Sequence, residues 1–176
     1  MLKNTLQLAF AVFVPLILVG ALAGCGNESP PESLGLDAKK IEVKSLDGEP
    51  FKITWRAKKP FVVNIWATWC APCIKELPSL MALEKKSDFA LLTIAIDNNP
   101  AVVKTFLRQQ GFESLPVVWD KNGQKVREQL GLRGVPTSFI LDENQRVVGV
   151  EQGEREWDHP DMIKKLHGYL EQSQGR

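Results

Sequence analysis

The residues best suited to chemistry are two cysteines separated by two positions, in the run Trp69-Cys70-Ala71-Pro72-Cys73. A structural disulfide stabilises a chain mainly when it closes a long loop, and a bond between Cys70 and Cys73 would close a very short one. The spacing therefore favours a redox role, in which the pair alternates between a disulfide and two thiols.

Disulfide exchange needs a thiolate, and a free cysteine with a pKa of about 8.5 is mostly protonated at neutral pH. An apolar strand pattern ends before Cys70 and a helical pattern begins after it. The backbone N–H groups and the dipole at a helix start favour negative charge there. We therefore expect Cys70 to be the exposed nucleophile and Cys73 to resolve the mixed disulfide, with Pro72 suited to the first helical turn.

Two polar residues near the pair are open to more than one interpretation. Glu76 lies three residues after Cys73 on a neighbouring part of one helical face, so its carboxylate could assist proton transfer at the thiols. Spacing alone favours a solvated surface charge instead. Asn64 interrupts an apolar strand, and we expect a satisfied polar side chain without a catalytic role. We assign Trp66 to packing.

The remaining pattern predicts an α/β fold. A lead-in hairpin is expected from residues 41–43 and 51–55 around Asp47-Gly48, and Pro78 should kink the helix after the cysteines. We expect further strands at 61–67, 89–96, 115–119, 137–141 and 146–150, and helices at 73–86, 100–110, 124–130 and 158–172. Apolar strands need cover on both faces, which favours helices on either side of a mixed sheet.

The first 24 residues resemble a lipoprotein signal peptide. Apart from Lys3 they carry no charge, and they end in Leu22-Ala23-Gly24-Cys25, which is similar to a bacterial lipobox. This resemblance implies that Cys25 is lipidated and that the chain is a membrane-anchored lipoprotein outside the cytoplasm. The alternatives are an uncleaved anchor helix and cleavage by ordinary signal peptidase.

A flexible tether is predicted at residues 25–36, which are rich in Pro, Ser and Gly, and one domain at 37–176. The chain has 22 Lys and Arg against 21 Asp and Glu. The chain has almost no excess of basic residues that could bind phosphates, so nucleic acid is not expected as a partner. Without Lys3 the chain is formally neutral, and membrane attachment would depend on lipid rather than on basic side chains.

Two segments carry a resemblance to the thioredoxin superfamily over residues 37 to 176. They are Trp66-Ala67-Thr68-Trp69-Cys70-Ala71-Pro72-Cys73, with Pro78 five residues on, and Gly134-Val135-Pro136-Thr137 before a strand. The resemblance implies a thioredoxin-like three-layer sandwich with a central mixed sheet and an extra N-terminal β-hairpin. That hairpin, the segment 100–130 and Glu76 are similar to the TlpA/ResA/DsbE group of anchored extracytoplasmic proteins.

The resemblance also implies roles for residues around the cysteines. The Val135–Pro136 bond would be cis and face the pair, although sequence alone favours trans, and the Val135 backbone would pair with an extended substrate. Trp69 would contribute to substrate binding, and Ala71 and Pro72 would tune the redox potential. Glu76 would be an active-site group.

The implied activity is thiol-disulfide exchange without a cofactor, in the direction of reducing protein disulfides, with the cysteines of apocytochrome c as one candidate substrate. A membrane thiol transporter would supply electrons. Two alternatives stay open. A copper-binding module would use Cys70 and Cys73, although the two histidines, His159 and His167, lie in or near the last helix. A peroxidase of the same fold would have Thr where this chain has Ala67.

Overall fold

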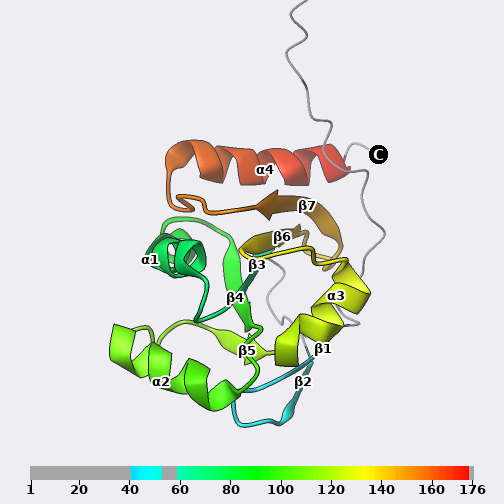
Figure 1. Cartoon of the computed structure of the whole chain (residues 1–176). Helices are drawn as coiled ribbons and strands as arrows, with labels where there is room; N and C mark the ends of the chain where they lie inside the picture. The colour runs from blue at the N-terminus through cyan, green and yellow to red at the C-terminus, as the bar shows by residue number, and fades with distance from the viewer. Residues whose placement is uncertain (1–40, 53–58, 175–176) are drawn as a thin grey trace, which may run out of the picture.

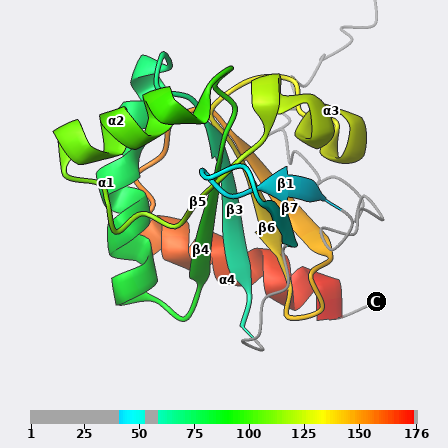
Figure 2. The same ribbon diagram turned by 90° about the horizontal axis from the view of Figure 1, so that it is seen from below.

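The structure is a computed structural model that describes residues 41–52 and 59–174. These residues form a seven-stranded sheet with the strand order β2-β1-β5-β4-β3-β6-β7 and helices packed around it (Figure 1). Figure 2 shows β4, β3, β6 and β7 side by side, with α4 crossing behind them. The predicted thioredoxin-like sandwich is confirmed.

The strand β3 (Phe61–Trp66) is the centre of the sheet. It pairs in parallel with β4 (Ala90–Ala95) and antiparallel with β6 (Thr137–Leu141), so the sheet is mixed. Every residue of these three strands is buried. A strand that is covered on both faces needs a nearly continuous apolar sequence, which is why these segments lack the alternation of a half-exposed strand.

The lead-in hairpin is confirmed over the residues that the structure describes. The strands β1 (Glu42–Lys44) and β2 (Pro50–Lys52) pair antiparallel, and β1 joins the main sheet where Lys44 pairs with Trp119 of β5 (Val117–Trp119). The end of the predicted second strand, residues 53–55, lies outside the described residues, as do the predicted signal peptide, the tether and Cys25.

The helices begin and end close to the predicted positions. They are α1 (Ala71–Lys86), α2 (Pro100–Gln110), the short η2 (Lys121–Gly123), α3 (Gln124–Leu130) and α4 (Pro160–Gln174). Asn99 caps α2 by accepting a hydrogen bond from the backbone N–H of Ala101 at 2.9 Å, and Gly111 ends it with φ 72°. Pro78 lies inside α1, which continues beyond it to Lys86, and the kink at this position stays a prediction.

The connection between β7 (Val147–Gln152) and α4 lies beside α1, and hydrogen bonds between them join residues that are 79 and 81 positions apart (Figure 1). Lys75 on α1 forms an ion pair with Glu154 in this connection at 2.5 Å, and Lys86 forms one with Asp158 at 2.6 Å. The C-terminal part of the chain therefore forms one wall of the region below the cysteines. Among the described residues, none of the helices has the length and apolar character needed to cross a bilayer.

Candidate active site

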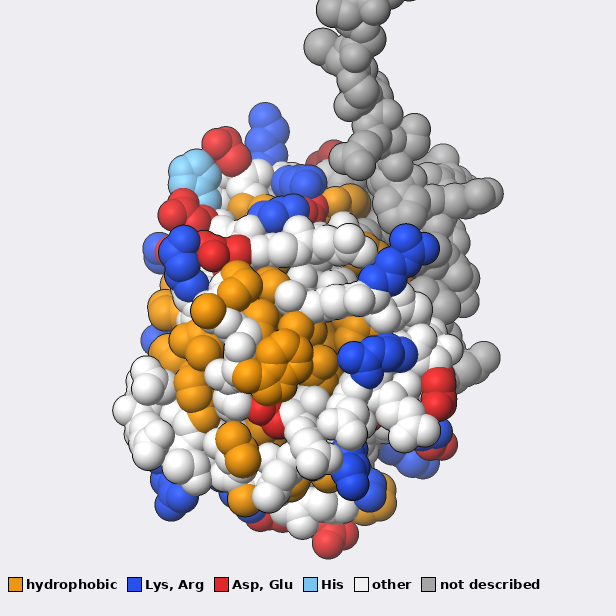
Figure 3. Space-filling view, in the orientation of Figure 1, with side chains coloured by type: hydrophobic (Ala, Val, Ile, Leu, Met, Phe, Trp, Pro, Cys, Tyr) orange, Lys and Arg blue, Asp and Glu red, His pale blue; other side chains and the backbone are white. Residues whose placement is uncertain are grey.

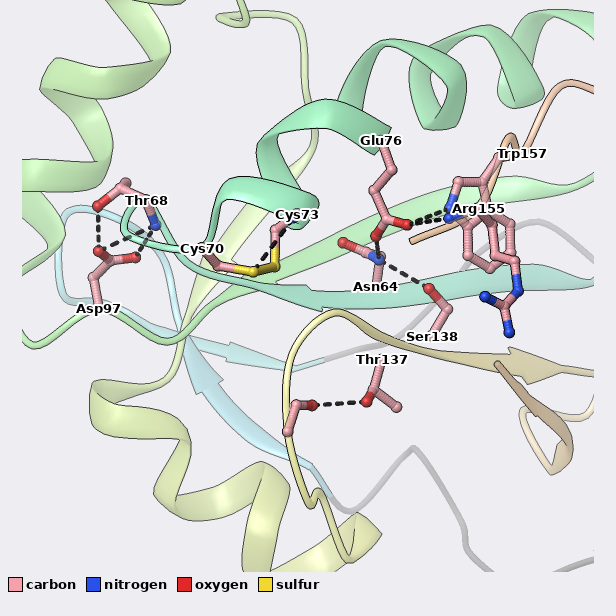
Figure 4. Close-up of a disulfide and its surroundings, with 11 residues drawn as sticks. Asn64, Thr68, Cys70, Cys73, Glu76, Asp97, Thr137, Ser138, Arg155 and Trp157 are labelled. Atoms are coloured by element: carbon pink, nitrogen blue, oxygen red, sulfur yellow. Dashed lines mark hydrogen bonds between the residues drawn. A yellow bond between two sulfur atoms is a disulfide. The ribbon is translucent and has the colours of Figure 1, made fainter. Parts of the chain in front are cut away.

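Cys70 and Cys73 form a disulfide at the junction of β3 and α1, with their sulfur atoms 2.08 Å apart (Figure 4). Cys70 is the N-cap of α1, and its sulfur accepts a hydrogen bond from the backbone N–H of Cys73 at 3.3 Å. Pro72 is the second residue of the helix. The predicted position of Cys70 at a helix start is confirmed, and the N–H group aimed at its sulfur would stabilise a thiolate there.

The two cysteines differ slightly in exposure. The side chain of Cys73 is fully buried, and Cys70 is 6% exposed. We predicted an exposed Cys70, and in the disulfide form it is largely buried. It is nevertheless the only one of the two cysteines with any exposed surface. This difference agrees with the expected assignment of Cys70 to attack and of Cys73 to resolution.

The loop before the cysteines is held by Asp97, which follows β4 and is buried. Its carboxylate accepts hydrogen bonds from the backbone N–H of Thr68 at 3.1 and 3.3 Å and from the Thr68 hydroxyl at 2.5 Å (Figure 4). We did not predict this contact from the sequence. The available signal was a polar residue directly after a buried strand, because the ends of adjacent parallel strands lie together.

The segment from Gly134 to Thr137, which precedes β6, also lies at this edge of the sheet. The Val135–Pro136 peptide bond is cis, as the resemblance implied. Thr137 pairs with Ile65 at the end of β3, which brings Pro136 beside the strand end from which the cysteine loop starts. The Thr137 hydroxyl donates to the carbonyl of Gly134 at 2.7 Å, and this bond fixes the turn.

Around the cysteines the surface is apolar. The Trp69 side chain is 67% exposed, and Ala71 and Pro72 are exposed beside it. Figure 3 shows apolar side chains gathered in front of α1 and the neighbouring strand ends. Trp69 also lines a cavity of about 510 Å³ with Asp97, and Arg127 lies on its wall. Trp66, in contrast, is fully buried and packs at 5.6 Å between ring centroids against Phe106, in the expected packing role.

Glu76 is a buried carboxylate, so the expectation of a solvated surface charge is wrong. Its side chain is 1% exposed. It accepts hydrogen bonds from the amide of Asn64 at 2.8 Å, the indole of Trp157 at 3.0 Å and the backbone N–H of Arg155 at 3.0 Å. Burial raises the pKa of Glu76 above its ordinary value, and these neutral donors oppose the shift without reversing it.

Glu151 is a second buried carboxylate nearby in a different electrostatic setting. Its partners are the side chain of Arg155 at 3.0 Å, the hydroxyl of Tyr169 at 2.6 Å and the ammonium group of Lys165. Burial alone would raise the pKa of Glu151, but Lys165, Tyr169 and Arg155 outweigh it and hold the pKa below its ordinary value. Arg155 connects the two carboxylates, since its backbone binds Glu76 and its side chain binds Glu151.

The side chain of Asn64 is only half satisfied, contrary to our expectation. Its nitrogen donates to Glu76 at 2.8 Å and to the hydroxyl of Ser138 at 2.9 Å. Its oxygen is buried and has no hydrogen-bond partner among the described residues. Sequence reasoning also missed Trp157, because no motif connects a residue beyond β7 with the cysteines.

The alternatives to thiol-disulfide exchange find no additional support at this site. His159 and His167 have half-exposed side chains, near Asp161 at 3.6 Å and Asp88 at 3.4 Å respectively. Within residues 41–52 and 59–174, no group of three or more His, Cys, Asp or Glu side chains is arranged to hold a metal ion. Ala67, where a peroxidase would carry Thr, is fully buried.

Comparison with known proteins gives consistent matches. The Redoxin family matches residues 33–166. The thiol-disulfide oxidoreductase ResA of Bacillus anthracis is 32% identical over 178 residues, covering 97% of each chain. A thiol:disulfide interchange protein of the thioredoxin family from Chlorobium tepidum superimposes with a TM-score of 0.60, 28% identity, and coverage of 77% of this chain and 98% of that one. The exposed lipoprotein thioredoxin Etrx1 of Streptococcus pneumoniae superimposes with a TM-score of 0.61 and 25% identity. The match covers 72% of this chain and 97% of that one.

The contrast between the two carboxylates predicts opposite pH dependences of stability. Glu76, with a raised pKa, contributes stability that is present below its unfolded pKa of about 4.3 and is lost as pH rises through the folded value. Glu151, with a lowered pKa, contributes stability that is present above about 4.3 and is lost as pH falls through the folded value. Each effect reaches a slope of at most about 1.4 kcal/mol per pH unit.

Urea unfolding of the oxidised protein from acid to neutral pH measures this difference. Glu76→Gln should flatten the decline above the unfolded pKa, and Glu151→Gln should flatten the decline below it. The assignment is wrong if both variants change the same limb of the curve.

Proposed function

Because the chain belongs to the Redoxin family, we propose that it is an extracytoplasmic thiol-disulfide oxidoreductase that works through Cys70 and Cys73. The observation that carries this proposal is the disulfide at the start of α1, with Cys70 slightly exposed and Cys73 fully buried. The similarity to ResA over nearly the whole chain supports the same activity.

The reaction proceeds by two exchanges of sulfur partners. The Cys70 thiolate attacks one sulfur of a substrate disulfide, which breaks that bond and releases the other substrate sulfur as a thiolate that takes up a proton. The Cys73 thiol then loses its proton and attacks the Cys70 sulfur, which releases the second substrate thiolate. Two electrons pass to the substrate, and the chain ends as the disulfide described above.

The proposed direction is reduction of protein disulfides, with electrons supplied through a membrane thiol transporter. This direction is supported by the resemblance to the TlpA/ResA/DsbE group, and the cysteines of apocytochrome c are the candidate substrate. The substrate would bind as an extended segment against the backbone of Val135, next to the cis bond to Pro136. The exposed Trp69 would contact its side chains, and Ala71 and Pro72 would tune the potential of the pair.

We place the protein on the outer face of a membrane. Residues 1–24 would be removed as a signal peptide, lipid would attach to Cys25, and residues 25–36 would tether the domain. The structural similarity to a pneumococcal lipoprotein thioredoxin supports this arrangement.

Glu76 would accept the proton that Cys73 loses during resolution. The two residues lie one turn apart on α1, both are buried, and burial raises the pKa of Glu76 above its ordinary value, which makes its carboxylate a better proton acceptor.

Trapping tests the assignment of the two cysteines. Cys73→Ala should hold substrate on Cys70, because no second thiol can resolve the mixed disulfide. Adducts that disappear on reduction should therefore appear on gels and in mass spectra of membrane extracts. Cys70→Ala is the matched control and should hold none, and adducts of equal amount on both variants would contradict the assignment.

The reduction potential of the pair tests the direction. We expect a value closer to about −270 mV, that of a reductant, than to about −120 mV, that of a strong oxidant. Equilibration with glutathione buffers, followed by alkylation and mass spectrometry, gives the value. A potential near the second figure would make the protein an oxidant.

The role of Glu76 is tested by the rate at which the mixed disulfide resolves. Glu76→Gln should slow resolution by about a hundredfold near neutral pH and change its pH profile, because the proton acceptor is lost. Glu84→Gln is the control, since Glu84 is an exposed carboxylate farther along the same helix. An unchanged rate and pH profile for Glu76→Gln would remove Glu76 from the mechanism.

A further inference from the structure

The amide oxygen of Asn64 is buried and has no hydrogen-bond partner among the described residues of the disulfide form. The orientation of the amide is fixed by its other half, which lies 2.8 Å from a carboxylate oxygen of Glu76 and 2.9 Å from the Ser138 hydroxyl. The Glu76 oxygens accept hydrogen bonds from Trp157 and Arg155 as well, and the nitrogen is the half of the amide that can donate to them. The oxygen therefore points away from Glu76, and no described residue donates to it.

This oxygen points toward Cys73. Cys73 and Glu76 are one helical turn apart on α1, and both are buried. Asn64 lies on β3 and donates a hydrogen bond to Glu76, the later of the two residues. In Figure 4 its nitrogen faces Glu76 and Ser138, and its oxygen points toward Cys73.

A disulfide sulfur carries no proton, whereas a thiol does, and this difference gives the oxygen a partner in one redox state only. We propose that Asn64 is a positioning residue for Cys73, whose S–H group donates a hydrogen bond to the Asn64 oxygen in the reduced chain. The proposal rests on the proposed function, because it requires that the disulfide be reduced. In that step a dithiol donor supplies two electrons and two protons, the S–S bond breaks, one proton stays on each sulfur, and the donor becomes a disulfide.

Two consequences follow for the reaction. The dithiol form gains a hydrogen bond and the disulfide form retains an unpaired buried acceptor, so Asn64 favours the dithiol. A hydrogen bond donated by the S–H group also favours the neutral thiol of Cys73 over its thiolate. Cys70 has a backbone N–H aimed at its sulfur, which favours its thiolate, so the two contacts act on the two thiols in opposite directions. The contact with Asn64 therefore favours a protonated Cys73 until the mixed disulfide has formed.

The first test replaces Asn64 with an apolar side chain of similar size. In Asn64→Leu the disulfide should be about tenfold harder to reduce at equilibrium with glutathione, which lowers the reduction potential by about 30 mV. Ser138→Ala is the matched control, because Ser138 contacts the amide nitrogen and leaves the oxygen in place. Its equilibrium constant should stay within about twofold of the unmodified chain. Equal constants for Asn64→Leu and Ser138→Ala would overturn the proposal.

A spectroscopic measurement tests the hydrogen bond while Asn64 is still present. The difference between the infrared spectra of the Cys70→Ser chain and the Cys70→Ser/Cys73→Ser chain contains the S–H band of Cys73 and cancels that of Cys25. This band should lie at lower wavenumber than that of an unbonded thiol, and Asn64→Leu should raise it. A band at the unbonded position with Asn64 present would overturn the proposal even if Asn64→Leu did not fold.

The outcomes also separate this inference from the proposed function. If the unmodified chain exchanges no disulfides, the proposed function fails. If it exchanges them and Asn64→Leu leaves both the equilibrium constant and the S–H band unchanged, the inference on Asn64 alone fails.

Discussion

The fold depends on the junction at which a fully buried strand passes directly into a helix. β3 is fixed on both sides by its neighbours, so its end cannot shift, and Asp97 fixes the next loop through Thr68. Helix α1 then starts on Cys70, whose sulfur takes the place of a capping oxygen. A helix start has N–H groups without partners, and here one of them is directed at the reactive atom.

Two buried carboxylates on one side of this junction differ in what surrounds them. Glu151 is held by two cationic side chains and a hydroxyl, which keep it ionised, and Glu76 is held by neutral donors only. A carboxylate paired with cations contributes to structure, whereas one with neutral donors remains able to change its protonation state. Arg155 contacts both carboxylates, so Glu151 also helps to fix the segment that covers Glu76.

The sequence was sufficient to predict the sheet, the helices and the cysteine pair, because the spacing of apolar residues, turn residues and short motifs are local signals. It was insufficient for Glu76, whose spacing is equally typical of a surface residue, because the burial comes from Trp157 and Arg155, which no local pattern connects with α1. The unpaired oxygen of Asn64 was also unpredictable, since satisfaction of an amide is decided by partners on other elements. The TlpA/ResA/DsbE resemblance indicated that Glu76 matters, and the structure supplied its environment.

The wall beside α1 is contributed by residues that follow Glu76 by 79 and 81 positions. A ribosome makes a chain from its N-terminus, so both thiols emerge well before the indole and the backbone N–H that enclose this carboxylate. The helix start and the Asp97 contact that surround the cysteines are therefore made before the enclosure of Glu76. The buried setting of this carboxylate is complete only when the C-terminal third has folded back against the helix, so it depends on completion of the domain.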